Sequence, residues 1–251
     1  SVRLSLIIFS PVLLLLTAYN LAFTNKIFPG VYVAQIEVGG LKTSQAKDLL
    51  YERVTPPTKI ILLYESKVFD ISTDKLNFSY DFDQSIKAAY KLDRSGNILF
   101  DLYQRLKAPY RYKNIGLRFK LDEESLERQL KNIALEIEVE PQYPSIELVK
   151  GQIIVNQGSP GTSVDLLKLR IDIGQNIAFA KNSPINIVLS PVDVGLNKDQ
   201  AEILKLRAQN ILEKNLILTF EDTKYVFKNE QLFNLLSANG GYDDEKIKSL
   251  I

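Results

Sequence analysis

The chain has 251 residues, of which 45% are hydrophobic and 24% charged, a length and balance that suit one large globular domain or two modest ones. Its 31 Lys and Arg residues face 30 Asp and Glu residues, so no basic excess indicates a nucleic-acid partner. Cys and His are absent, which excludes thiolate and imidazole metal sites, Ser-His-Asp triads, Cys-His dyads and a histidine general base. The composition still allows catalytic carboxylate pairs, Ser-Lys dyads and cation sites built from oxygen ligands alone.

The first feature along the chain is an apolar segment at residues 4–25 that carries no charge. A run of roughly 20 apolar residues matches the bilayer core, and Pro11 is tolerated in a membrane helix. A cleaved signal peptide has a shorter apolar region and a small-x-small cleavage site, and a buried core helix has more polar positions. We therefore expect a transmembrane signal anchor at residues 1–25, and Arg3 favours an extracytoplasmic location for the remainder.

Beyond residue 26, short strands and helices alternate. Pro56 and Pro57 end the first helix, and Glu65-Ser66 and Lys150-Gly151 mark the turns of two hairpins. In chain order, the expected elements are a strand at 31–38, a helix at 46–54, a hairpin at 60–71, helices at 83–91 and 98–106, a strand at 117–121, a helix at 122–134, a hairpin at 145–155, a helix at 165–177 and a strand at 185–189.

An internal repeat organises these elements. The motif IEVGGL at 36–41 recurs about 155 residues later as VDVGL at 192–196, each time followed by a helix. The likeness continues in the same order, with LLYE at 62–65 matching LTFE at 218–221 and DKL at 74–76 matching EQL at 230–232. Repetition at this separation predicts tandem modules, one at 26–190 and an incomplete second copy at 191–251.

One motif has the spacing of a catalytic dyad. Ser44 and Lys47 form a Ser-x-x-Lys pair, as in penicillin-recognising enzymes, but no Lys-Thr-Gly follows. The repeat replaces the pair with Asp199 and Glu202, as expected of a polar first helical turn. In the second copy Asn197 and Gln200 form a capping box at this turn. We therefore predict no catalytic residue.

Two further segments have both a binding and a structural interpretation. The sequence GSPGT at 158–162 lacks the Gly-Lys-Ser/Thr ending of a phosphate loop, so it is predicted to be a turn. The stretch 107–113 alternates cations with aromatic rings and could stack on sugars or bind anionic polymers. A solvated linker is the alternative for that stretch. Its candidate contact residues are Tyr110, Arg111 and Tyr112.

The sequence IFPGVYV at 27–33, continued through 36–46, resembles the N-terminal region of bacterial YoaR/VanW-type proteins, which also precedes YkuD-type L,D-transpeptidases. The similarity extends through Gly96-Asn97, the strand and helix at 117–133, and GSPGTSVD at 158–165. Lys42 and Gln45 depart from the usual Thr and acidic residue. The resemblance implies peptidoglycan-binding modules between membrane and wall. It carries over no catalytic residue, because the transpeptidase signature needs a Cys and a His.

We thus expect an α+β protein in which an N-terminal transmembrane helix precedes tandem modules with mainly antiparallel sheets. It would lie on the bacterial cell membrane as a single-pass protein with most of the chain outside, and would bind peptidoglycan without cofactor, metal or enzymatic activity. The alternative is the non-catalytic N-terminal part of an L,D-transpeptidase. A purely structural stalk is the rival to binding through Tyr110, Arg111 and Tyr112.

Overall fold

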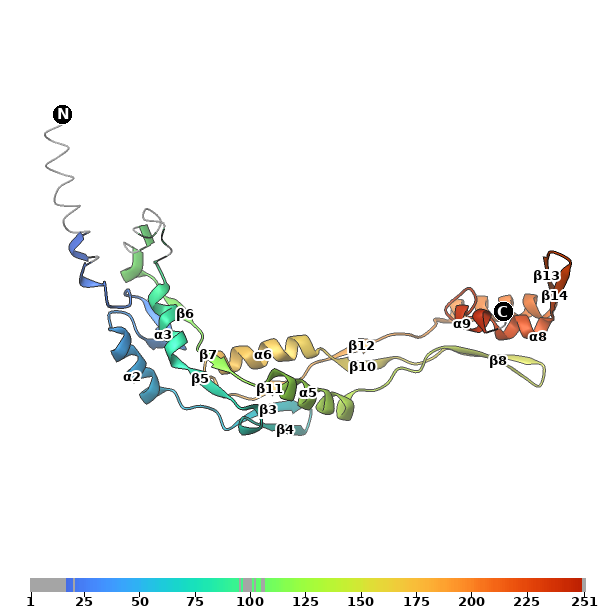
Figure 1. The fold of residues 1–251 in the computed structure, drawn as a ribbon. Helices are drawn as coiled ribbons and strands as arrows, with labels where there is room; N and C mark the ends of the chain where they lie inside the picture. Colours follow the sequence, from blue (N-terminus) through green and yellow to red (C-terminus); the bar gives the residue numbers. More distant parts are fainter. Residues whose placement is uncertain are drawn as a thin grey trace, which may run out of the picture. The chain divides into compact units, whose positions relative to one another are not determined.

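The computed structural model describes residues 17–19, 21–94, 96, 101, 103–104 and 107–249 (Figure 1). The chain divides into two compact units. Unit 1 comprises Ser1–Ile133 and Leu166–Ile187, and unit 2 comprises Ala134–Asp165 and Val188–Ile251.

The fold class is α+β with small, mainly antiparallel sheets, but the expected transmembrane helix is not found. None of the helices in the described ranges is both long and apolar enough to cross a membrane. The longest of them, α5 (Glu123–Ile137) and α7 (Lys198–Leu212), have 15 residues each and carry charged side chains along their length. At about 1.5 Å per residue they reach roughly 22 Å, short of a bilayer core of about 30 Å. Of the predicted segment, residues 1–16 and 20 lie outside the described residues.

The first part of unit 1 is a three-stranded sheet. Strand β1 (Val31–Val33) pairs antiparallel with β2 (Ile36–Glu37) and parallel with β6 (Lys113–Ile115). Val31 and Val33 are buried, and their core includes the inner faces of α2 (Thr43–Arg53) and α3 (Phe82–Lys91). Figure 1 shows these two helices side by side. The single strand predicted at 31–38 is thus two strands, because the chain turns sharply at residues 34–35.

The rest of unit 1 contains two smaller sheets. Strands β3 (Lys59–Tyr64) and β4 (Lys67–Ser72) form the predicted hairpin, and β11 (Ile185–Asn186) adds to β3 in parallel. The second sheet pairs β5 (Ser79–Asp81) with β7 (Arg118–Lys120). Unit 1 also contains the larger part of α5, helix α6 (Leu166–Ala178) and the 3-10 helices η1 (Asp74–Leu76) and η2 (Ala108–Tyr110). The helix expected at 98–106 lies mostly outside the described residues.

Unit 2 is built around helix α7. The predicted capping box is confirmed, because the side chains of Asn197 and Gln200 accept each other's backbone N–H at 2.9 Å. The core gathers Ala208 and Ile211 of α7 with Leu232 and Phe233 of α8 (Asn229–Asn234). Its other elements are the hairpin of β8 (Ser145–Val149) and β9 (Gln152–Asn156), the pair β10 (Gly161–Val164) and β12 (Leu189–Val192), the hairpin of β13 (Leu216–Phe220) and β14 (Thr223–Phe227), and helix α9 (Asp244–Lys248).

The order of elements recurs along the chain. Helix α2, the β3–β4 hairpin and η1 are followed later by α7, the β13–β14 hairpin and α8. The grouping into units crosses this order, since residues 134–165 belong with the segment after 188. The modules at 26–190 and 191–251 therefore stay a prediction.

Candidate functional site

The segment that contains the predicted contact residues is held against β1 by a glycine. Gly30 has a φ of +72°, and a Cβ there would lie 2.1 Å from the carbonyl oxygen of Arg111 and 2.5 Å from that of Ala108. The Gly30 carbonyl accepts the Lys113 N–H at 2.8 Å, which starts the parallel β1–β6 pairing. Only glycine combines this backbone conformation with so close an approach. The Pro-Gly of the sequence motif thus positions residues 108–113.

Arg111 is turned inward. Its guanidinium lies 2.5 Å from Asp93, whose other carboxylate oxygen is 2.7 Å from Lys113 Nζ. The Asp93 side chain is only 2% exposed, and Arg111 also contacts Gln104. A buried carboxylate needs such partners because removing it from water is costly. The role of Arg111 in the structure is therefore to neutralise Asp93.

Tyr110 and Tyr112 point outward. Tyr110 is 92% exposed and Tyr112 is 64% exposed. Tyr112 packs against Tyr32 of β1 with ring centroids 4.5 Å apart and an interplanar angle of 40°. The structure therefore separates the three predicted contact residues into two outward rings and one inward cation, and brings in a third tyrosine.

Strand pairing places three side chains on the outer face of this sheet, and a ring contact adds a fourth. Tyr32 alternates with the buried Val31 and Val33, and its register partners are Glu37 and Asn114, which share its face. Tyr112 lies just before β6 and joins them because its ring packs against Tyr32. We call this set, Tyr32, Glu37, Tyr112 and Asn114, the tyrosine face.

Polar contacts fix the tyrosine face. Partial burial, the Glu37 carboxylate and the ionisable hydroxyl of Tyr112 raise the pKa of Tyr32, whose hydroxyl donates to Glu37. Asn114 Oδ1 accepts the backbone N–H of Gln35 at 2.9 Å. That bond steadies a turn whose residues Ala34 and Gln35 both have positive φ, 47° and 69°. The hydrogen bonds to Glu37 and to Gln35 therefore link the side chains of the face to its own strands and turn.

Sequence reasoning missed Tyr32, Glu37 and Asn114. The alternation Val31-Tyr32-Val33 could have placed Tyr32 outward. The pairing of β1 with β6 could not be found, because the two strands are about 80 residues apart and parallel.

The Ser-x-x-Lys pair lies in a groove of about 330 Å³ beside α2 and α3. Lys47 Nζ is 2.7 Å from the Asp83 carboxylate. The hydrogen bond to Asp83 raises the pKa of Lys47, so the amine stays protonated at neutral pH. A protonated amine cannot take the proton of the Ser44 hydroxyl. The structure thus agrees with the interpretation of this motif as a polar helix start.

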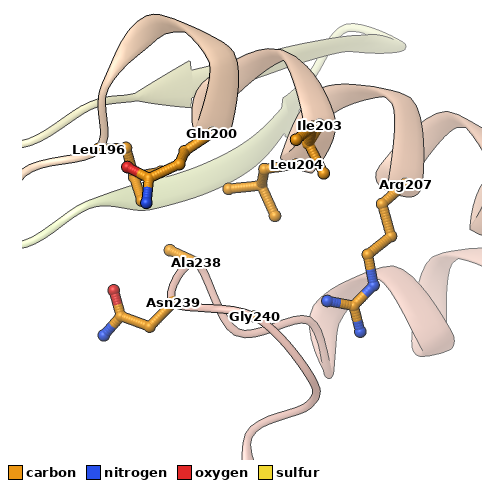
Figure 2. A pocket seen from close by; sticks show the side chains of 8 residues that line it. All are labelled: Leu196, Gln200, Ile203, Leu204, Arg207, Ala238, Asn239 and Gly240. Atoms are coloured by element: carbon orange, nitrogen blue, oxygen red, sulfur yellow. The ribbon is translucent and has the colours of Figure 1, made fainter.

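A second pocket, of about 170 Å³, lies in unit 2 between α7 and residues 238–240 (Figure 2). Figure 2 shows Gln200, Leu204 and Arg207 on the helix beside that loop. Two of its three polar side chains have partners within the unit, since Gln200 caps α7 and Arg207 donates to the Gly241 carbonyl at 2.8 Å, and the third is Asn239. The pocket therefore presents mainly apolar surface and no group suited to chemistry.

In the glycine-rich segment at 158–162, the backbone passes very close to the backbone of residues 139–144. A Cβ at Gly158 would lie 2.4 Å from the Gln142 carbonyl oxygen, and one at Gly161 would lie 2.3 Å from that of Val139. The segment is extended and makes antiparallel bridges with residues 139 and 142, and Gly161 and Thr162 begin strand β10, so the predicted turn is wrong. Within the described ranges, no group of three or more acidic side chains gathers that could hold a metal ion.

The comparisons with known proteins concern the middle of the chain. Residues 69–186 match the family model described as "Putative peptidoglycan binding domain", which is just under half of the chain. No curated protein and no protein of solved structure matches. The match runs from β4 to β11, and its description names a binding function and no catalytic one. Residues 69–186, which include Tyr110, Arg111 and Tyr112, are therefore similar to a peptidoglycan-binding domain.

Proposed function

We propose that this chain is a non-catalytic, cell-wall-associated protein that binds peptidoglycan outside the cytoplasm. The observation that carries the proposal is the family match over residues 69–186. Because residues 27–46 resemble YoaR/VanW-type proteins, we propose those proteins as the wider family of this chain. No observation favours the alternative, in which the chain is the non-catalytic N-terminal part of an L,D-transpeptidase.

The near-neutral charge of the chain limits the kind of contact that it can make with the wall. The formal net charge is +1, and the Arg111 and Lys113 side chains face Asp93. A near-neutral protein has no long-range attraction to anionic polymers. We therefore expect short-range contacts to uncharged parts of the wall, with an affinity that depends little on salt.

Sedimentation with purified sacculi tests the proposal. The 251-residue chain is mixed with sacculi at low and at moderate salt and centrifuged, and a sample without sacculi shows how much sediments alone. We expect a saturable fraction in the pellet at both salt concentrations. If the chain stays in the supernatant at both, it does not bind the wall, and a structural stalk is the better description.

A further inference from the structure

We propose that the tyrosine face is the surface that binds peptidoglycan, and that it takes the sugar rings of the glycan strands and not the peptides that cross-link them. This inference rests on the peptidoglycan binding proposed above. The observation behind it is the pairing of two outward tyrosines, Tyr32 and Tyr112, on a sheet that the sequence does not reveal.

The two rings suit a sugar. A pyranose ring has an apolar face of C–H groups that packs on the electron-rich face of an aromatic ring. Tyr112 is 64% exposed, and its neighbour Tyr32 is partly exposed beside it at 4.5 Å. The two rings pack on each other at a tilt of 40°, so the more exposed Tyr112 offers the main stacking surface and Tyr32 supports it.

The polar groups at the edges of the rings suit an N-acetylated sugar. Glu37 and Asn114 flank Tyr32 on the same face. A carboxylate accepts hydrogen bonds from sugar hydroxyls and from an acetamido N–H, and an amide nitrogen donates to the acetyl carbonyl. The Oδ1 atom of Asn114 is bonded to Gln35, which directs the amide nitrogen to other acceptors.

Charge argues against the peptides. The cross-linking peptides carry free carboxylates, which call for an outward Arg or Lys. On this segment, both Arg111 and Lys113 are bound to Asp93, and the charged member of the tyrosine face is the acidic Glu37. An acidic face beside two aromatic rings favours an uncharged, hydroxyl-rich ligand.

The face is rigid before any ligand arrives. Two backbone hydrogen bonds of 2.8 Å, from Ala34 N–H to the Ile115 carbonyl and from Lys113 N–H to the Gly30 carbonyl, join β1 to β6. The ion pair of Lys113 with the buried Asp93 holds the same segment. A surface already in its bound arrangement loses little conformational entropy on binding.

Competition on sacculi tests the inference. The 251-residue chain is bound to sacculi, and either oligomers of N-acetylglucosamine, which carry no charge, or the free cross-linking peptides are added. We expect the sugar oligomers to release the chain and the peptides to leave it bound. Tyr32→Ala and Tyr112→Ala should each weaken sacculus binding about tenfold, the loss typical of a central aromatic contact. Tyr112→Phe should recover most of the binding lost in Tyr112→Ala, because the ring face is kept.

Two controls separate the outcomes. Tyr143 is 67% exposed and lies in unit 2, so Tyr143→Ala should leave binding unchanged. Circular dichroism and the melting temperature show whether each variant is folded, and only folded variants are compared. Release by the peptides, or full binding by a folded Tyr112→Ala variant, overturns the inference while peptidoglycan binding stands. Absence of wild-type binding removes the proposed function itself.

Discussion

Asp93 is the residue whose environment most constrains the segment around the tyrosine face. Its side chain is 2% exposed and faces Arg111 and Lys113, whose side chains are 19% and 32% exposed. Asp93→Asn leaves two cations without their carboxylate, and breaking a buried pair in this way costs about 3–5 kcal/mol. We expect a loss near the lower value, because Lys113 keeps some contact with water. Urea unfolding measures the loss of free energy, and hydrogen exchange at the β1 and β6 amides shows whether it falls on this sheet.

The matched control for Asp93 is Asp70. It pairs with Lys59 at 2.7 Å, but these side chains are 47% and 50% exposed. Water screens such a pair, so Asp70→Asn should cost less than about 1 kcal/mol. Equal losses for the two variants would show that Asp93 is not a buried charge centre.

Gly30 and Gly40 form a second matched pair. Both have positive φ, +72° and +81°, but a Cβ at Gly40 meets no atom within 4 Å, whereas at Gly30 it meets the carbonyl oxygens of Ala108 and Arg111. Gly40→Ala should therefore cost only the left-handed conformation, about 1 kcal/mol. Gly30→Ala must also displace residues 108–111, so we expect a clearly larger loss in melting temperature and, because Tyr112 follows, weaker sacculus binding. Similar losses for both would contradict the close approach.

Tyr80 gives a prediction about pH. Burial raises its pKa to about 12, and its hydroxyl donates to the Ile177 carbonyl at 2.9 Å. The unfolded chain releases this proton near pH 10 and the folded chain only near 12, so the stabilisation is complete below pH 10 and is lost as pH rises towards 12. We expect the difference in unfolding free energy between wild type and Tyr80→Phe to shrink between pH 9 and 11.5. A difference that does not change with pH would contradict this.

At the scale of elements, the β8–β9 hairpin is the clearest test of unit 2. Ile153 packs with the core that contains Ala208 and Ile211 of α7, whereas its neighbour Ile154 is 50% exposed. Ile153→Ala should destabilise unit 2 by about 2 kcal/mol, and Ile154→Ala by less than about 0.5 kcal/mol. Hydrogen exchange at the α7 amides reports the change, with the β3 amides as the reference in unit 1. Equal exchange in the two variants would show that the hairpin does not contribute to this core.

Local elements could be predicted from the sequence because their signals are local. The turn at Glu65-Ser66 and the cap at Asn197 were correct, since turn and cap chemistry depends on adjacent residues. Helix α2 begins at Thr43, three residues before the predicted start, because its polar first turn lacks apolar periodicity. The tight turn at residues 34–35 was missed, since it has neither Gly nor Asn to mark its positive φ.

Long-range pairings could not be predicted. The parallel contacts of β1 with β6 and of β11 with β3 join segments separated by many elements, and no turn specifies them. The tyrosine face depends on the pairing of β1 with β6. Tyr110 and Tyr112 were found from composition, but the inward turn of Arg111 and the partner Tyr32 follow only from the sheet.

For the whole molecule, the sequence predicted a peptidoglycan-binding module at 26–190, and residues 69–186 within it match the family model of a peptidoglycan-binding domain. The predicted transmembrane helix was wrong for the described part of the chain, where the helices are too short or too polar to cross a bilayer. Hydropathy alone had led to that prediction. The repeat remains a proposal supported by the shared order of helix, hairpin and short helix in residues 43–76 and 198–234.

The most direct test of the central claim is hydrogen exchange of the 251-residue chain with and without soluble peptidoglycan strands. We expect slower exchange in β1, β2 and the segment leading into β6, with no change in α7 or in residues 238–240. Unchanged exchange throughout, or slowing confined to the pocket of unit 2, would contradict it.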